Sequence, residues 1–307
     1  MRNISKFYPI IAALILGVIG GIIRGMELLK AIDTYTGIYD FGGLGFLLPL
    51  LTVIAVCFAV ISSRKLKKDN DRAYVDIMKV NSKPVAIIGV IGALIIAAAG
   101  VISFISTVTD AYFWSLVKNM AEGTVSVKAV LKSGEITDVI TSALYAVLMV
   151  FAGVSIIAAT MKRVNGKLCD HAEILLSIPM YWACFLFLFT FVEHPVEPVR
   201  QIFVYDLLAS CALLIAVYKY SAIAYGRKCV FSASASSLCA MYLMTTVALG
   251  RLIHIVSTGS TYYLYDAPLR MVCFGGALLV LLMDTITVLQ NSGKREENND
   301  QTDSAEC

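Results

Sequence analysis

Charged residues are scarce in this chain of 307 residues. Lys, Arg, Asp and Glu together make up 15% of it, whereas apolar residues make up 58%. A soluble globular domain carries roughly 25% charged residues, and the mean hydropathy of +0.78 lies far above that of such a domain. The net charge of +3 is too small to favour nucleic acid as a partner. The composition therefore excludes an ordinary soluble protein and indicates a membrane protein.

The chain also lacks the motifs of common catalytic and cofactor sites. It contains no GxSxG, Walker A or GxGxxG sequence. His171, His194 and His254 stand near the ends of predicted helices, which does not favour a haem held between two histidines. Glu193, His194 and Glu197 form the sequence E-H-P-V-E, whose proline and spacing differ from the helical HExxH zinc motif. The sequence thus contains no catalytic constellation, and we expect no cofactor and no metal. A membrane enzyme is the third interpretation, after the two functions given below.

Long apolar segments fill almost the whole sequence. A helix needs about 20 mainly apolar residues to cross the hydrocarbon core of a bilayer. No run of alternating apolar and polar residues suggests a barrel, so the sequence predicts an all-α, multi-pass bundle. Its eight predicted transmembrane helices are Tyr8–Leu29, Phe41–Ser62, Val85–Val108, Val139–Met161, Ile174–Val192, Phe203–Tyr225, Phe231–Ser257 and Leu269–Gln290.

The basic residues between these spans predict the orientation. Sixteen Lys and Arg residues fall on the two chain ends and the even-numbered connections, against six on the odd-numbered connections. Cytoplasmic segments carry the excess of Lys and Arg. We therefore predict a protein of the cell membrane with both termini in the cytoplasm.

Cysteine positions agree with this orientation. Five of the eight cysteines lie within predicted spans and the other three, Cys169, Cys229 and Cys307, on the predicted cytoplasmic side. The predicted outward connections contain none, so no extracellular disulfide is expected.

Three segments outside the spans differ in character. The basic connection of residues 63–84 is expected to lie along anionic lipid head groups, where each Lys or Arg contributes about 1 kcal/mol. The outward segment Asp110–Asp138 begins with aromatic residues typical of the membrane interface. The acidic residues 291–307 predict a disordered cytoplasmic tail, which leaves 1–290 as the transmembrane domain.

Small residues recur at helical spacing within two spans. Gly17, Gly21 and Gly25 stand four residues apart in the first span, and Gly89, Ala93 and Ala97 do so in the third. Such ridges let helices in lipid pack closely. Pro49 and Pro179 interrupt the second and fifth spans. They do not occupy corresponding positions in two halves of the chain, so they do not indicate the paired broken helices of repeat transporters.

Ionisable residues within the spans are the sharpest functional signal, because burying a charge in a membrane is costly. Lys219 and Asp284 are expected to form a small pair in the cytoplasmic half. A larger group recurs at one depth near the predicted outward face, on helices 1, 6, 7 and 8. We interpret it as a candidate polar pocket formed by Arg24, Glu27, Asp206, Arg251, His254 and Arg270. Asp206 is too short to reach the membrane surface, so we predict that it faces Arg24 or Arg251.

Two stretches carry a resemblance to known proteins. One runs from Arg24 through Asp33 and Gly37 at the end of the first span. The other joins His194-Pro-Val-Glu-Pro to Val204-Tyr-Asp-Leu-Leu-Ala209. Together they resemble a group of uncharacterised eight-helix bacterial membrane proteins. The resemblance implies the eight-helix architecture and no particular activity.

Two functions from different classes fit these features. The first is a solute-handling or transport-associated protein with an outward-facing polar pocket. The second is a sensor, an assembly factor or a subunit that packs its helices against a partner without transporting anything. A continuous cavity lined by acidic and basic residues favours the first. A filled interior and a flat apolar groove between helices favour the second.

The predicted topology can be tested by labelling single introduced cysteines with an impermeant reagent. Ser126→Cys and Thr261→Cys should react in intact cells, because both positions lie in outward connections. Asn70→Cys should react only after permeabilisation. Labelling of Asn70→Cys in intact cells would reverse the orientation that the basic residues predict.

Overall fold

A computed structural model describes residues 4–30, 44–70, 74–109, 114, 118, 135–166, 172–192, 199–259 and 267–292. Every element in these ranges is helical. The eight long helices are α1 (Ile4–Lys30), α2 (Leu44–Ser63), α4 (Lys83–Thr109), α7 (Glu135–Val164), α8 (Ala172–Val192), α9 (Val199–Ala224), α10 (Val230–Thr258) and α11 (Ala267–Ser292). Two short elements, the 3₁₀ helix η1 (Arg64–Asp69) and α3 (Tyr74–Met78), lie between α2 and α4.

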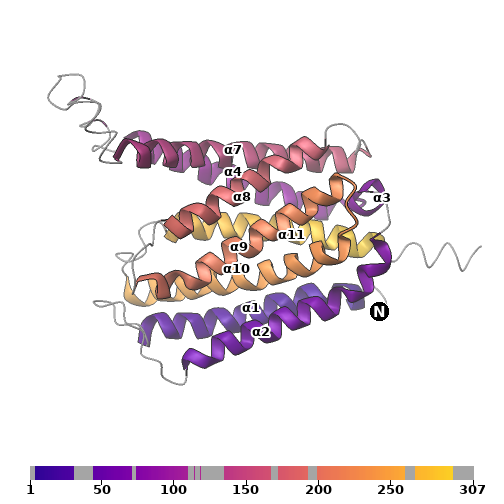
Figure 1. The fold of residues 1–307 in the computed structure, drawn as a ribbon, viewed down its shortest axis with the longest axis horizontal. Helices are drawn as coiled ribbons and strands as arrows, with labels where there is room; N and C mark the ends of the chain where they lie inside the picture. Colours follow the sequence, from indigo (N-terminus) through magenta and orange to yellow (C-terminus); the bar gives the residue numbers. More distant parts are fainter. Residues whose placement is uncertain are drawn as a thin grey trace, which may run out of the picture.

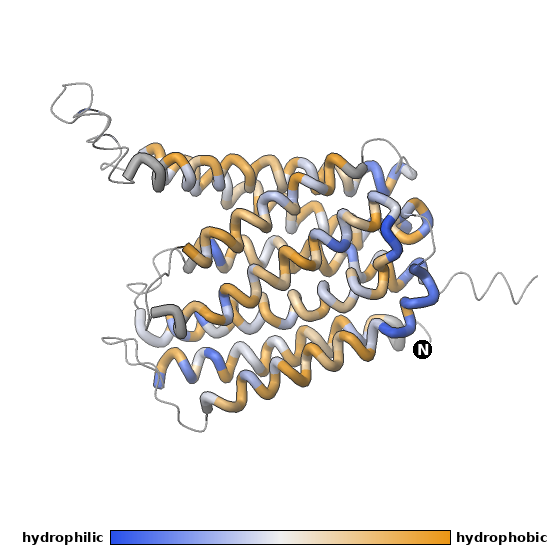
Figure 2. Tube along the Cα trace, in the orientation of Figure 1, coloured by the Kyte–Doolittle hydropathy of each residue, from blue (hydrophilic) through white to orange (hydrophobic). Residues whose placement is uncertain are grey.

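The predicted eight-span architecture is confirmed within the described residues. Each long helix is long and apolar enough to cross a membrane. Figure 2 shows apolar residues along the helices and hydrophilic ones gathered at the end of the bundle where η1 lies. The start of α1 and the end of α11 lie at this same end (Figure 1). The cytoplasmic location of that end stays a prediction. The predicted outward segment 110–138 lies outside the described residues, except for residues 114 and 118 and the first residues of α7.

The helices pack as two groups around α10 and α11. On one side, α1 and α2 pack against α10. On the other, α4 lies between α11 and α7, and α8 connects α7 to α9, which returns to α10 (Figure 1). Helices α10 and α11 contact each other and have the largest buried shares of the eight spans. They therefore form the centre of the bundle.

The predicted glycine ridge of α1 faces α10. A Cβ atom added at Gly21 would lie 2.7 Å from the Cβ of Leu249. The neighbouring ridge positions, Gly17 and Gly25, would meet Thr245 and Ile253 at 2.8 Å in the same way. The ridge therefore brings the two backbones closer than any larger residue allows, which is how helices in lipid gain packing energy.

The small residues of α4 allow close contact with two neighbouring helices, α11 and α7. A Cβ at Gly92 would lie 2.5 Å from the carbonyl oxygen of Gly276 on α11. On α7, a Cβ at Gly153 would lie 2.6 Å from the carbonyl oxygen of Ala93 and 2.7 Å from the Cβ of Ala97. The ridge predicted in the third span therefore lies within helix contacts and not toward lipid.

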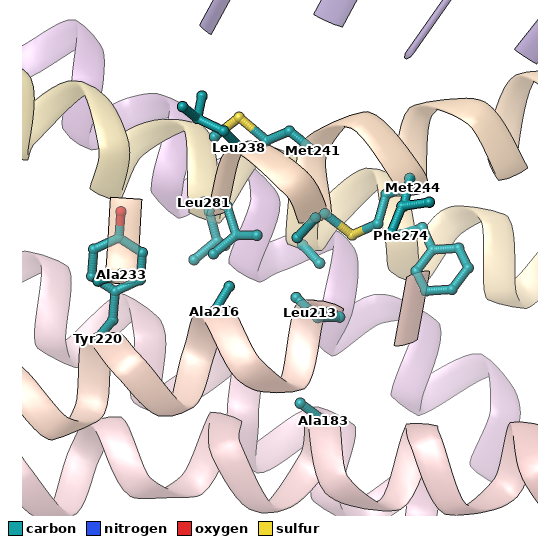
Figure 3. Packing of buried hydrophobic residues seen from close by; sticks show 14 of the residues in the cluster. Ala183, Leu213, Ala216, Tyr220, Ala233, Leu238, Met241, Met244, Phe274 and Leu281 are labelled. Atoms are coloured by element: carbon teal, nitrogen blue, oxygen red, sulfur yellow. The ribbon is translucent and has the colours of Figure 1, made fainter. Parts of the chain in front are cut away.

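Large apolar side chains fill the centre between α9, α10 and α11. Figure 3 shows Leu213 on α9 and Met241 on α10 among the buried residues that surround Leu281 of α11. Leu213 and Leu281 are only 1% exposed and Met241 is fully buried. Close packing here holds α9 against the two central helices.

The basic connection of residues 63–84 is more folded than the sequence indicated. Leu66, Ile77 and Met78 are buried against the bundle. The Nδ2 of Asn291 donates to the carbonyl oxygens of Ile77 at 2.8 Å and Lys79 at 2.9 Å. Apolar residues of the connection thus anchor it, while the basic side chains of η1 stay exposed. Its contact with anionic lipid remains a prediction.

The last span also ends later than predicted. Helix α11 continues to Ser292, and the buried Asn291 belongs to it and not to a tail. Residues 293–307, where the disordered tail is predicted, lie outside the described residues.

We expect Gly21→Leu to destabilise the protein by about 1–3 kcal/mol or more, because the new side chain overlaps Leu249 and pushes α10 away. Thermal unfolding in detergent measures the change. Gly275→Ala is the matched control, because a Cβ at Gly275 meets no atom within 4 Å. Leu16→Ile keeps the side-chain volume and should also be nearly neutral. Equal stability of Gly21→Leu and the two controls would contradict the close contact.

Candidate functional site

The six charged or titratable residues predicted as a polar pocket are all buried near one end of the bundle. Their exposure ranges from 1% at Glu27 to 8% at His254 and Arg270. They come from α1, α9, α10 and α11. This end is the one opposite η1, the predicted outward end.

Asp206 and Arg251 form a buried ion pair between α9 and α10. Oδ1 of Asp206 lies 2.7 Å from Nη2 of Arg251. The Arg251 guanidinium also lies over the ring of Phe203, 5.2 Å from its centroid. This is within the distance of about 6 Å at which a cation and an aromatic ring attract each other. The prediction that Asp206 faces Arg24 or Arg251 is therefore confirmed, with Arg251 as the partner.

Arg24 and Glu27 form a second ion pair within one turn of α1. Nη1 of Arg24 donates to Oε2 of Glu27 at 3.0 Å. The guanidinium lies 5.1 Å from the ring centroid of Tyr205 on α9. The side chain crosses Gly250 of α10, where an added Cβ would lie 2.7 Å from Cγ of Arg24. Arg24 thus links α1 to both α9 and α10.

His254 lies one turn beyond Arg251 on α10. Its Nδ1 atom is buried and makes no hydrogen bond within the described part of the chain. A buried polar atom without a partner costs free energy, so such atoms are rare in folded proteins. His254 does not line either of the two cavities described below.

Arg270 lines a cavity at the same end of the bundle, which we name the outer cavity. Its volume is about 540 Å³, and it lies between the ends of α4, α7, α8 and α11. Its polar lining consists of Arg270 with the hydroxyl-bearing residues Ser103, Ser106, Thr107, Ser142 and Tyr145. Of the six predicted pocket residues, only Arg270 lines this cavity.

Sequence reasoning missed the hydroxyl residues of the outer cavity. Ser103, Ser106 and Thr107 have the spacing i, i+3, i+4, which places them on one face of the last turns of α4. That spacing in an otherwise apolar span was the available signal. Ser and Thr are also common in the contacts between membrane helices, so the signal alone does not identify a cavity.

A second polar group lies in the half of the bundle nearer η1. Arg163 of α7 forms an ion pair with Asp284 of α11, and its Nε donates to Oη of Tyr74 at 3.4 Å. The predicted pairing of Asp284 with Lys219 is therefore wrong. The Lys219 ammonium lies 5.5 Å from the ring centroid of Tyr218 instead. Arg163 follows Lys162 just after a predicted span and is one of the sixteen basic residues from which the orientation is predicted.

Hydroxyl groups continue this second polar group across the bundle. Oη of Tyr220 lies 3.2 Å from Oγ1 of Thr285, which lies 2.7 Å from Oγ of Ser237. These hydrogen bonds thus join α9, α11 and α10 through side chains that are at most 2% exposed. Each hydroxyl has a partner, as buried polar groups require.

Within the described ranges, no group of three His, Cys, Asp or Glu side chains could hold a metal ion. The cysteines there, from Cys57 to Cys273, are free. Glu193, His194, Glu197 and the side chain of His171 lie outside the described residues. Among the described residues, ionisable side chains instead form ion pairs and ring contacts.

Comparison with protein-family models, with curated proteins and with solved structures gave no match.

We expect Asp206→Asn to destabilise the protein by about 3–5 kcal/mol, because it leaves the buried Arg251 guanidinium without its carboxylate. Adding Arg251→Gln should cost little more, because the pair is already broken. Thermal unfolding of the two single variants and the double variant in detergent measures this coupling.

Arg24→Gln is the matched control for this cycle. It also removes a buried guanidinium, but one paired with Glu27, so its effect should add to that of Asp206→Asn. Additive losses for Asp206→Asn and Arg251→Gln would contradict the pair.

Proposed function

We propose that this multi-pass membrane protein binds a small anionic solute in the outer cavity and takes part in its transport or handling. The observation that carries the proposal is the buried Arg270 guanidinium lining a cavity of about 540 Å³ together with five hydroxyl-bearing residues. The proposal places the protein in the cell membrane with both termini in the cytoplasm.

The chemistry of the lining favours an anion. Arginine presents a planar fork of N–H donors that matches carboxylate and phosphate groups. Hydroxyl groups donate further hydrogen bonds to such oxygens. Ionisable residues within membrane spans most often mark substrate or ion pathways. Carboxylates and phosphates are therefore the solute class that this lining suits best.

The size of the outer cavity supports a small solute. Cavities that bind small molecules usually have volumes of about 300–1,000 Å³. The apolar part of the lining, which includes Ile102, Leu186 and Phe189, would contact the carbon skeleton of an organic anion. An organic acid or a phosphate ester of a few carbon atoms fits both parts.

A specific observation also favours the second candidate, a sensor, assembly factor or partner subunit. The charges on α1, α9 and α10 are engaged in ion pairs and ring contacts with one another. A filled interior of this kind is expected of a component that transports nothing. The two candidates differ in one property, binding of a solute at Arg270.

Solute binding can be tested by the thermal stability of the purified protein. We expect inorganic phosphate or one of a set of short mono- and dicarboxylates to raise Tm, because a ligand of the folded state stabilises it by mass action. Arg270→Gln should abolish that rise while the protein stays folded.

Lys219→Gln is the matched control, since it also removes one positive charge from a span but does not line the outer cavity. It should keep the rise in Tm. If no anion raises Tm, or if the rise survives Arg270→Gln, then the outer cavity is not an anion site and the second candidate is favoured.

A further inference from the structure

A second, smaller cavity lies in the half of the bundle nearer η1, and we name it the inner cavity. It has a volume of about 30 Å³. It lies between the same four helices as the outer cavity, α4, α7, α8 and α11, with α9 added. The polar side chains that line it include Arg163, Asp284, Tyr220, Ser221 and Trp182.

The two cavities lie one above the other along the helices. On three helices, the nearest lining residues of the two cavities are only three or four positions apart. These pairs are Ile96 and Ala99 on α4, Trp182 and Leu186 on α8, and Ala277 and Cys273 on α11. Three or four residues are about one turn of helix, roughly 5 Å along the axis. An apolar layer therefore separates the cavities. It is about one turn thick along α4, α8 and α11, and thicker along α7, where the nearest lining residues are Tyr145 and Ile156.

The inner cavity contains a buried donor without an acceptor. Nε1 of Trp182 is buried and makes no hydrogen bond within the described part of the chain. Trp182 is only 1% exposed and lines the inner cavity. The indole N–H of a buried tryptophan usually finds a partner. A space of about 30 Å³ holds a water molecule, which would accept this hydrogen bond.

We infer that the two cavities are the outer and inner parts of one solute pathway enclosed by α4, α7, α8 and α11. The pathway is closed in this structure. This inference rests on the proposed function, for which it supplies the route of the anionic solute through the membrane.

Two barriers close the pathway. The first is the apolar layer, in which Leu186 is 2% exposed and Ile96 is fully buried. The second is the ion pair of Arg163 with Asp284, which ties α7 to α11 on the inner side. Arg163 belongs to this second barrier and lines the inner cavity, so an anion that has left Arg270 would next meet a guanidinium that is paired with Asp284.

Helix α8 contains a point at which the pathway can open. Pro179 lies within α8 and lines the inner cavity. Proline removes a backbone hydrogen bond and lets a helix bend. One turn earlier, the carbonyl oxygen of Leu176 accepts a hydrogen bond from Oγ of Ser221, at 2.6 Å. Bending of α8 at Pro179 would move Leu186, which lies on the outer side of that proline.

Accessibility of a cysteine placed in the inner cavity tests the pathway without knowledge of the solute. Ser221→Cys is introduced into the full chain after its eight native cysteines are replaced. Leu186→Ala then thins the apolar layer. A small impermeant thiol reagent is added to sealed vesicles on the side where Arg270 lies. Ser210→Cys is the matched control, because Ser210 is also a buried serine of α9 but lines neither cavity.

The pathway predicts that Leu186→Ala speeds modification of Ser221→Cys by roughly tenfold, as expected when a local opening free energy falls by about 1.4 kcal/mol. Modification of Ser210→Cys should not change. Equal rates at the two positions, or a rate at Ser221→Cys that neither Leu186→Ala nor Ile96→Ala raises, would overturn the inference. The thermal-stability experiment with Arg270→Gln would still decide separately whether an anion binds at Arg270.

Fluorescence gives a second measurement that needs no cysteine. The chain has two tryptophans, so Trp114→Phe leaves Trp182 as the reporter. Acrylamide should quench Trp182 more strongly once Leu186→Ala is added, because the inner cavity then communicates with the outer one. Quenching that does not change would also overturn the inference.

Discussion

The packing of the eight long helices depends on the close approach of their backbones. Within lipid, the hydrophobic effect does not drive helices together, so close contact must supply the packing energy. Gly21 lets α1 lie directly against Leu249 of α10, and Gly92 meets the Gly276 backbone of α11. These contacts fix which helices are neighbours. The Arg24 side chain then crosses Gly250 of α10, where these small residues have already brought α1 and α10 together.

Charge burial imposes the second condition, because an unpaired charge in the interior is strongly destabilising. Asp206 with Arg251 satisfies it between α9 and α10, and Arg163 with Asp284 satisfies it between α7 and α11. Each pair joins helices that share no backbone hydrogen bond. The pairs therefore compensate the cost of burial and also tie together helices that the small-residue contacts do not join, such as α7 and α11 with α4 between them.

Much of the fold could be predicted because its main determinant is local. A membrane span can be recognised from its length and hydropathy alone. The predicted ends of the spans in α8 and α10 differ from the observed ends by at most one residue. The pairing of Asp206 was also predictable, because a short carboxylate in a span must find a partner among the few cations at its depth.

The partner of Asp284 and the outer cavity could not be predicted in the same way. Arg163 stands at the end of a span, where a long basic side chain usually extends to the membrane surface. In the structure it turns inward to α11, a choice made by packing between distant segments. Ser103 and Ser106 line a cavity because α7 and α11 pack beside α4 and α8 closes the same space, and hydropathy carries no information on that order.

The two sides of the bundle differ in a way that bears on movement. On the α1 and α10 side, the glycine ridge and the Arg24 and Arg251 pairs leave each charge engaged and the backbones in contact. Prolines lie within helices on both sides, such as Pro49 in α2 and Pro179 in α8. The outer and inner cavities, however, both lie between α4, α7, α8 and α11, with α9 also lining the inner one. Close-packed elements resist deformation, whereas cavities and prolines lower the cost of local movement. The first side is therefore suited to be a fixed scaffold, against which α8 can move without breaking the ion pairs that hold α1, α9 and α10 together.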